Sequence, residues 1–261
     1  MILFRKYGKS PFNIALIHGG PGAAGSITPL SIELSKKFGI LEPIQTELSI
    51  EGQIQELFLI LEKEGTSPII LIGHSWGAWL ALIYASRFPS GLKKLIMIGS
   101  GPFKDEYAKD IMITRYQRLE EKERSELQLL LAILEYPGNK DRDNTFKKSA
   151  GFIRKADSYN PINLSDDHIE CNYDIFQNIW KEAEELRRSG ELLKMAGKVK
   201  CPVMAIHGDY DPHPAEGVNK PLSTSIKDFK FISLGKCGHE PWNEKYAKEE
   251  FYRILSEELE L

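Results

Sequence analysis

Three polar side chains have the types and the chain order that nucleophilic hydrolysis requires. Ser75 stands in the pentapeptide Gly-His-Ser-Trp-Gly at 73–77, between an apolar run that predicts a strand and another that predicts a helix. Asp211 and His239 follow in the order serine, acid, histidine, each just past a short apolar run. A serine hydroxyl is a weak nucleophile at neutral pH, so it needs a neighbouring base that a third group orients. The pattern predicts a catalytic triad of Ser75, His239 and Asp211.

The tetrahedral intermediate of such a reaction also needs hydrogen-bond donors for its oxyanion. The backbone N–H of Trp76, directly after the serine, is one candidate. The other is the N–H of Gly20 in the loop His-Gly-Gly-Pro-Gly at 18–22, which follows a short apolar run. Glycine there lets the main chain come close and turn its amide inward. We therefore expect an oxyanion hole made by the backbone amides of Gly20 and Trp76.

The segment around the acid allows other interpretations. Asp209 is a rival acid two residues earlier, and Asp105 is a more distant one. His207 and His213 flank Asp211, and histidine with carboxylate ligands can bind zinc or iron. Because the triad explains the same segment, the sequence predicts neither a metal nor another cofactor.

The elements that must position these residues alternate between strand and helix. Apolar runs predict strands at 14–17, 40–44, 69–72, 94–98, 202–206 and 229–232. Helical spacing of apolar residues separates the first four of them and returns in a last helix at about 246–259. This alternation predicts an α/β fold with a doubly wound, mostly parallel sheet of about six or seven strands and helices on both faces.

The stretch 103–200 breaks this rhythm, because it is richly charged and its apolar residues recur at helical spacing. One stripe is formed by Leu127, Leu130, Leu131 and Leu134, and another by Ile175, Ile179, Ala183 and Leu186. We expect a helical cap inserted at 103–200 into a core made of 1–102 and 201–261. The alternative is an extension of the helical layers of the core.

Composition excludes several classes of function. The 261 residues include 34 basic and 37 acidic ones. The chain therefore lacks the excess of basic residues that would indicate nucleic-acid binding. No apolar run is long enough for a membrane span, and the charged start does not resemble a secretory signal. The 3 cysteines are widely spaced and predict neither a disulfide framework nor a zinc cluster. A cytoplasmic protein acting on a small molecule or a short peptide is expected.

These motifs resemble the α/β-hydrolase superfamily over almost the whole chain. The loop His-Gly-Gly-Pro-Gly at 18–22 and the Trp after the nucleophile resemble its proline iminopeptidase branch. That resemblance implies removal of an N-terminal residue, often proline, from small peptides, with acidic side chains in or near the cap binding the free amine. The acidic candidates are Glu170, Glu182, Glu184 and Glu185. Pro212 departs from the branch, some of whose members have a glutamate directly after the catalytic aspartate.

Other functions stay open at this point. A serine hydrolase that cleaves a small ester or amide is the first hypothesis, and the aminopeptidase is a special case of it. A carboxylesterase of small acyl esters is the nearest alternative, because the cap sets specificity. The same triad also supports carbon–carbon bond hydrolases and lyases. A non-catalytic binding protein is the last alternative, although such proteins usually lack one of the three residues, and all three are present here.

Overall fold

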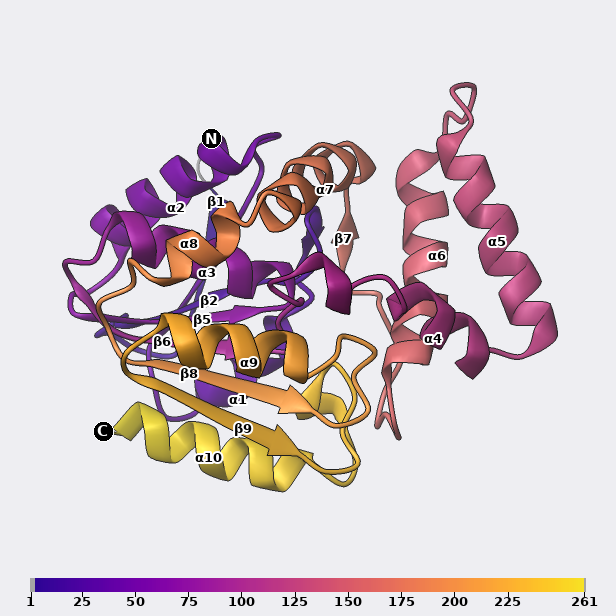
Figure 1. Ribbon diagram of the computed structural model, residues 1–261. Coiled ribbons are helices and arrows are strands. Elements are labelled where there is room, and N and C mark those ends of the chain that lie inside the picture. Colours follow the sequence, from indigo (N-terminus) through magenta and orange to yellow (C-terminus); the bar gives the residue numbers. More distant parts are fainter. Residues whose placement is uncertain (1–2, 261) are drawn as a thin grey trace.

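A seven-stranded sheet forms the centre of the computed structural model, which describes residues 3–260 (Figure 1). Its strands lie in the order β1-β4-β2-β5-β6-β8-β9. Their bounds are Leu3–Tyr7 (β1), Ile14–Ile17 (β2), Ile40–Ile44 (β4), Ile69–His74 (β5), Leu92–Ile98 (β6), Val203–Gly208 (β8) and Phe229–Leu234 (β9). β1 pairs antiparallel with β4, whereas the other neighbouring strands pair in parallel. The predicted α/β fold with a mostly parallel sheet is confirmed.

Helices cover both faces of the sheet, because the central strands are apolar on both faces. Leu16 and Ile72 belong to an apolar cluster shared with α1 and α10, whereas Ile17 and Leu71 belong to one shared with α2, α3, α8 and α9. The bounds are Thr28–Leu34 (α1), Ile50–Glu64 (α2), Trp76–Arg87 (α3), Glu191–Ala196 (α8), Glu216–Ser225 (α9) and Lys248–Glu260 (α10). Within residues 3–260, no helix combines the length and the apolar character needed to span a bilayer.

The predicted insertion divides into two parts. α4 (Ile111–Arg118), α5 (Glu121–Glu135) and α6 (Arg142–Asp157) stand to one side of the sheet (Figure 1). They pack on one another around buried residues that include Leu119 and Leu127. α7 (Tyr173–Arg188) and α8 instead join the core, where Ile179 and Leu192 are fully buried. We call the first part the cap, whereas the second extends a helical layer of the core; the role of the cap and the boundaries at 102 and 201 stay predictions.

Two contacts tie this insertion to the carboxyl edge of the sheet. The short strands β3 (Ala23–Ala24), after the glycine loop, and β7 (Glu170–Cys171), before α7, pair antiparallel. At the end of α6, the carbonyl of Asp157 accepts from the N–H of His239 at 2.9 Å. The segment 158–172 therefore runs from the histidine loop to the glycine loop. Two short 3-10 helices, Asp105–Tyr107 (η1) and Pro241–Asn243 (η2), complete the described elements.

Candidate active site

Ser75 lies on a sharp turn between β5 and α3. Its φ of 53° and ψ of −116° are values that residues other than glycine rarely adopt. The Ser75 N–H donates to the carbonyl of Ile98 on β6 at 2.9 Å, which holds the turn. A Cβ atom on Gly73 would collide with the main chain of Gly77, and one on Gly77 with the carbonyl of Ile17. The sequence folds into an elbow here because only glycine permits these approaches, and Ser75 stays half-buried at the carboxyl edge.

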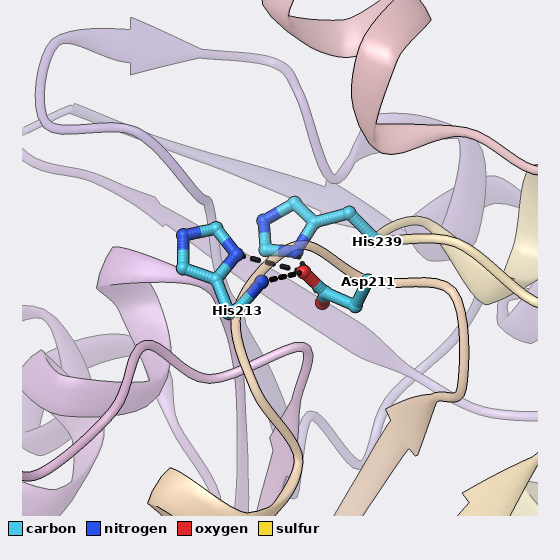
Figure 2. A group of neighbouring side chains, drawn as sticks. All are labelled: Asp211, His213 and His239. Carbon is cyan, nitrogen blue, oxygen red and sulfur yellow. Dashed lines mark hydrogen bonds and ion pairs between the residues drawn. The ribbon is translucent and has the colours of Figure 1, made fainter. Parts of the chain in front are cut away.

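Asp211 and His239 meet at the same edge, on the loops that follow β8 and β9. Nδ1 of His239 lies 2.6 Å from Oδ2 of Asp211 (Figure 2). Burial of the His239 ring opposes its protonation, but the charge and hydrogen bond of Asp211 outweigh burial and raise the pKa of His239. Burial opposes ionisation of Asp211 as well, yet the surrounding histidines hold its pKa well below the usual range. His239 therefore donates from Nδ1 to a carboxylate, which leaves its Nε2 as the base.

The rival acids lie away from His239. Asp209 is exposed, and its Oδ1 accepts from the N–H of Cys237 at 3.1 Å. Asp105 forms an ion pair with Arg187 at 2.8 Å. Of the three acids considered from the sequence, the structure brings Asp211 to His239.

Ser75 is linked to His239 through neighbouring main chain. Gly99 follows Ile98, whose carbonyl accepts from the Ser75 N–H. Gly99 also packs so closely against His239 that an added Cβ would lie 3.1 Å from Nδ1 of His239. The ring of His74, next to Ser75, lies 4.7 Å from the His239 ring between centroids. The hydrogen bonds of residues 3–260 include none between Ser75 and His239. In free enzymes this contact is often long and tightens only when substrate binds.

The segments that carry the two predicted oxyanion donors lie beside Ser75. An added Cβ on Gly19 would lie 3.2 Å from Cβ of Ser75, so the glycine loop packs against the nucleophile. Gly20 has a φ of 50°, which favours glycine. In the part of the chain that the structure describes, neither the Gly20 N–H nor the Trp76 N–H donates to a backbone carbonyl. The Trp76 amide opens α3, where the helix dipole favours negative charge. The oxyanion hole stays a prediction that these free donors support.

Two further buried histidines hold the main chain of the site. Nε2 of His74 lies 3.0 Å from the carbonyl of His239, and Nε2 of His207 lies 2.7 Å from the carbonyl of His213. Since a carbonyl can only accept, both rings must carry their proton on Nε2. The Nδ1 atoms of both rings, which are unprotonated in that tautomer, are buried and form no hydrogen bond among the described residues. Because Nε2 of each ring binds a loop carbonyl, both rings hold the position of the loops.

Asp211, His213 and His239 are the group of described residues whose donors lie close enough together to ligate a metal. The Asp211 oxygens lie 2.6 Å from Nδ1 of His239 and 2.7 Å from Nδ1 of His213. These lengths suit charge-assisted hydrogen bonds. A tetrahedral metal about 2.1 Å from each ligand would hold such atoms roughly 3.4 Å apart. The distances therefore favour protons between these atoms, and the sequence-based prediction of no metal is kept.

A buried carboxylate joins the cap to the histidine loop, and sequence analysis missed it. Glu244 is 1% exposed and accepts from the N–H groups of Tyr159 and Asn160 at 2.7 Å and of Gly238 at 2.9 Å. Nearby, Arg154 of α6 pairs with Glu240, the residue after His239, at 2.9 Å. Because Tyr159 and Asn160 lie 85 and 84 residues before Glu244 in the chain, no local pattern marks the contact. We infer that the cap helps to fix the loop that carries His239.

Glu244→Ala tests this link. The variant would leave three backbone N–H donors without their acceptor. If one or two of them stay unpaired, the protein loses about 3 kcal/mol of stability. We expect a lower melting temperature and a decrease of about tenfold in kcat/KM, measured by calorimetry and steady-state kinetics. Glu249→Ala, which removes an exposed carboxylate from α10, serves as the control. A Glu244→Ala protein with unchanged melting temperature and kcat/KM would show that the link is dispensable.

The four carboxylates suggested for amine binding make other contacts. Glu170 pairs with Arg5 at 3.0 Å, and Glu182 accepts from the N–H of Ile50 at 2.9 Å. Glu184 and Glu185 are exposed on α7 and pair with arginines of the same helix. None of these contacts involves a residue of the predicted triad.

The Trp76 side chain is buried and contacts α2, while its backbone N–H stays a predicted oxyanion donor. Its indole is 2% exposed, and Nε1 donates to Oε1 of Gln53 on α2 at 3.2 Å.

A pocket of about 760 Å³ lies at the opposite edge of the sheet, beside residues such as Asn13 and Ile70 at the amino ends of β2 and β5. It contains none of the candidate catalytic residues, so it is not the site described above.

Comparisons with known proteins agree with this architecture. The family profile described as "alpha/beta hydrolase fold" matches residues 14–242. A proline iminopeptidase of Lactobacillus helveticus is 23% identical over 95% of this chain and 89% of its own length. The human monoacylglycerol lipase ABHD6 is 24% identical over 74% of this chain and 56% of its own. The structure of a proline iminopeptidase from Mycobacterium smegmatis superposes with a TM-score of 0.62 at 20% identity, covering 98% of this chain and 93% of that one.

Proposed function

The chain belongs to the alpha/beta hydrolase fold family and is a hydrolase, and from this premise we propose that it is a serine hydrolase that cleaves a small ester or amide through an acyl-enzyme on Ser75. The observation that carries the proposal is the 2.6 Å hydrogen bond between His239 and Asp211 at the sheet edge where Ser75 occupies its strained turn. Strain of this kind persists where the surroundings enforce it, and it is concentrated at functional sites.

The proposed reaction has two steps that share one base. Oγ of Ser75 attacks the carbonyl carbon while Nε2 of His239 takes its proton, and the amides of Gly20 and Trp76 receive the oxyanion. His239 then gives the proton to the leaving amine or alcohol, which departs as the acyl-enzyme forms. In the second step water gives its proton to His239 and attacks the acyl group. Return of that proton to Ser75 releases the acid.

The finer proposal is an aminopeptidase similar to proline iminopeptidases. The loop at 18–22, the pentapeptide around Ser75 and the relatives that carry this name support it. A carboxylesterase of small acyl esters is the second candidate. It is favoured because the four acidic candidates already pair with arginines or with a backbone N–H. The geometry gives no reason to prefer a carbon–carbon bond hydrolase or a lyase.

A substrate comparison separates the two candidates. Prolyl and other aminoacyl p-nitroanilides are compared with short p-nitrophenyl esters, and Ser75→Ala provides the blank. Serine-dependent anilide cleavage that is lost when the amine is blocked would support the aminopeptidase. Cleavage of esters alone would contradict it and favour the esterase.

The pH dependence should report the ionisation of His239. The protonated ring cannot accept the Ser75 proton, so kcat/KM is expected to rise with pH and to level off above the pKa of His239. Asp211 raises that pKa above its ordinary value of 6.5. Asp211→Asn removes the charge that favours the protonated ring, so it should move the bend to lower pH. It should also reduce kcat by roughly 10⁴-fold, the usual cost of a wrongly oriented or wrongly protonated base.

Asp209→Asn is the matched control for this prediction, because it makes the same change two residues away. It should leave the profile in place. If Asp209→Asn caused the larger loss, or if the bend were the same in all three proteins, Asp211 would not be the acid.

A further inference from the structure

The carboxylate of Asp211 accepts hydrogen bonds from two imidazoles, one on each oxygen. Oδ2 accepts from Nδ1 of His239 at 2.6 Å, whereas Oδ1 accepts from Nδ1 of His213 at 2.7 Å and from the His213 N–H at 2.9 Å (Figure 2). The Asp211 side chain is fully buried, and the His213 side chain is 10% exposed. A triad requires only the first of these imidazoles, so the second needs an explanation of its own.

His213 meets Asp211 as a neutral donor. Burial lowers its pKa despite the neighbouring carboxylate, so the ring carries a single proton at neutral pH. The ionised Asp211 can only accept, which places that proton on Nδ1. The charged and titratable groups around the ring include Asp211, His74, His207, His239 and, from α4, Arg115. Among these groups, Asp211 is the one that accepts the Nδ1–H of His213.

Contacts other than those with Asp211 also hold His213. Its backbone carbonyl accepts from Nε2 of His207 at 2.7 Å, and its ring packs against that of His239 with centroids 4.7 Å apart. A carboxylate bound only by His239 and one backbone amide could still turn about its Cβ–Cγ bond. The additional donor from the His213 ring opposes this rotation, because charge-assisted hydrogen bonds are short and directional.

We propose that His213 is a positioning residue, whose Nδ1–H holds the Asp211 carboxylate in the orientation that His239 needs and shares its negative charge. The inference rests on the proposed triad. It has a consequence for His239, because a carboxylate with one donor fewer directs more of its charge to the remaining imidazole. Loss of the His213 ring should therefore make His239 easier to protonate, and it should also make the carboxylate less well oriented.

Three variants test this role. His213→Ala removes the donor, whereas in His213→Asn the side-chain amide can replace Nδ1–H and cannot titrate near neutral pH. His168→Asn makes the same change at a histidine of the 158–172 segment and serves as the control. The readouts are the pH titration of the His239 ring by NMR, the pH profile of kcat/KM, and circular dichroism to confirm folding.

We expect His213→Ala to lower kcat/KM by about tenfold, the scale of one lost hydrogen bond to a charged group. The His239 titration and the bend of the profile should both move to higher pH. His213→Asn should recover most of the rate and most of the shift. Unchanged titration and rate in a folded His213→Ala protein would overturn the proposal. The NMR titration tests the role of His213 without depending on turnover. The Ser75 mechanism is tested separately, because activity retained by Ser75→Ala would contradict it.

Discussion

Ser75→Ala should abolish turnover, with a decrease in kcat on the order of 10⁶-fold and no loss of folding. The change removes the atom that would form the acyl-enzyme, and triad members act as a unit, so the remaining groups cannot compensate. Stability should change little, because the Ser75 hydroxyl is half-buried at the sheet edge and makes no hydrogen bond among those of the described residues. The measurement is steady-state hydrolysis of p-nitrophenyl esters and aminoacyl anilides, with the melting temperature recorded in parallel.

Ser86→Ala is a suitable control for this result. Ser86 lies on α3, the helix that follows Ser75, and its Oγ donates to the carbonyl of Ile83 at 2.7 Å. Full activity of Ser86→Ala together with none in Ser75→Ala is the expected pattern. Activity retained by a pure, folded Ser75→Ala protein would mean that another residue performs the attack.

His239→Ala should be almost as damaging, with a decrease on the order of 10⁵- to 10⁶-fold. Without the imidazole, no group accepts the serine proton or returns it to the leaving group. The loop itself should persist, because the His239 N–H binds Asp157 and its carbonyl faces Nε2 of His74, and both contacts use the backbone. Kinetics with circular dichroism would test this directly.

The control for His239→Ala is His168→Ala, since neither backbone contact of the His239 loop involves that residue. If the two variants lost activity equally, the loss would come from a general disturbance of the 158–172 segment or of folding. If His239→Ala kept more than about one-hundredth of the activity, a base outside the predicted triad would have to be sought.

Much of the fold could be predicted because its signals are local. Runs such as 14–17 and 69–72 are apolar at every position, which is typical of parallel strands covered on both faces. The stretch 103–200 was harder, because amphipathic helices of a cap and of a core layer have the same periodicity. Ile179 and Leu192 pack on the core, whereas Leu127 packs within the cap, and only tertiary contacts distinguish the two.

The predicted site residues depend on local patterns to different degrees. Ser75 and His239 could be found from motifs at strand ends, but Asp211 and Asp209 have the same local setting. Only the fold shows that Asp211 contacts His239. The burial of the Trp76 side chain against Gln53 likewise became visible only in the fold.

Two contributions were missed in the sequence. His213 was considered only as a metal ligand, although a residue two positions after an aspartate commonly gives its N–H to that side chain. Glu244 binds main chain from a segment far away in the sequence. Contacts of this kind depend on how distant loops meet, which composition and periodicity do not encode.

Covalent labelling of Ser75 tests the central claim most directly. A fluorophosphonate forms a phosphorus–oxygen bond with an activated serine and releases fluoride, so peptide mass spectrometry can locate the adduct. The triad predicts one adduct per chain, on Ser75, which is lost in His239→Ala and suppressed by a substrate that is turned over. No adduct, or an adduct on another serine with Ser75 unmodified, would contradict the proposed mechanism.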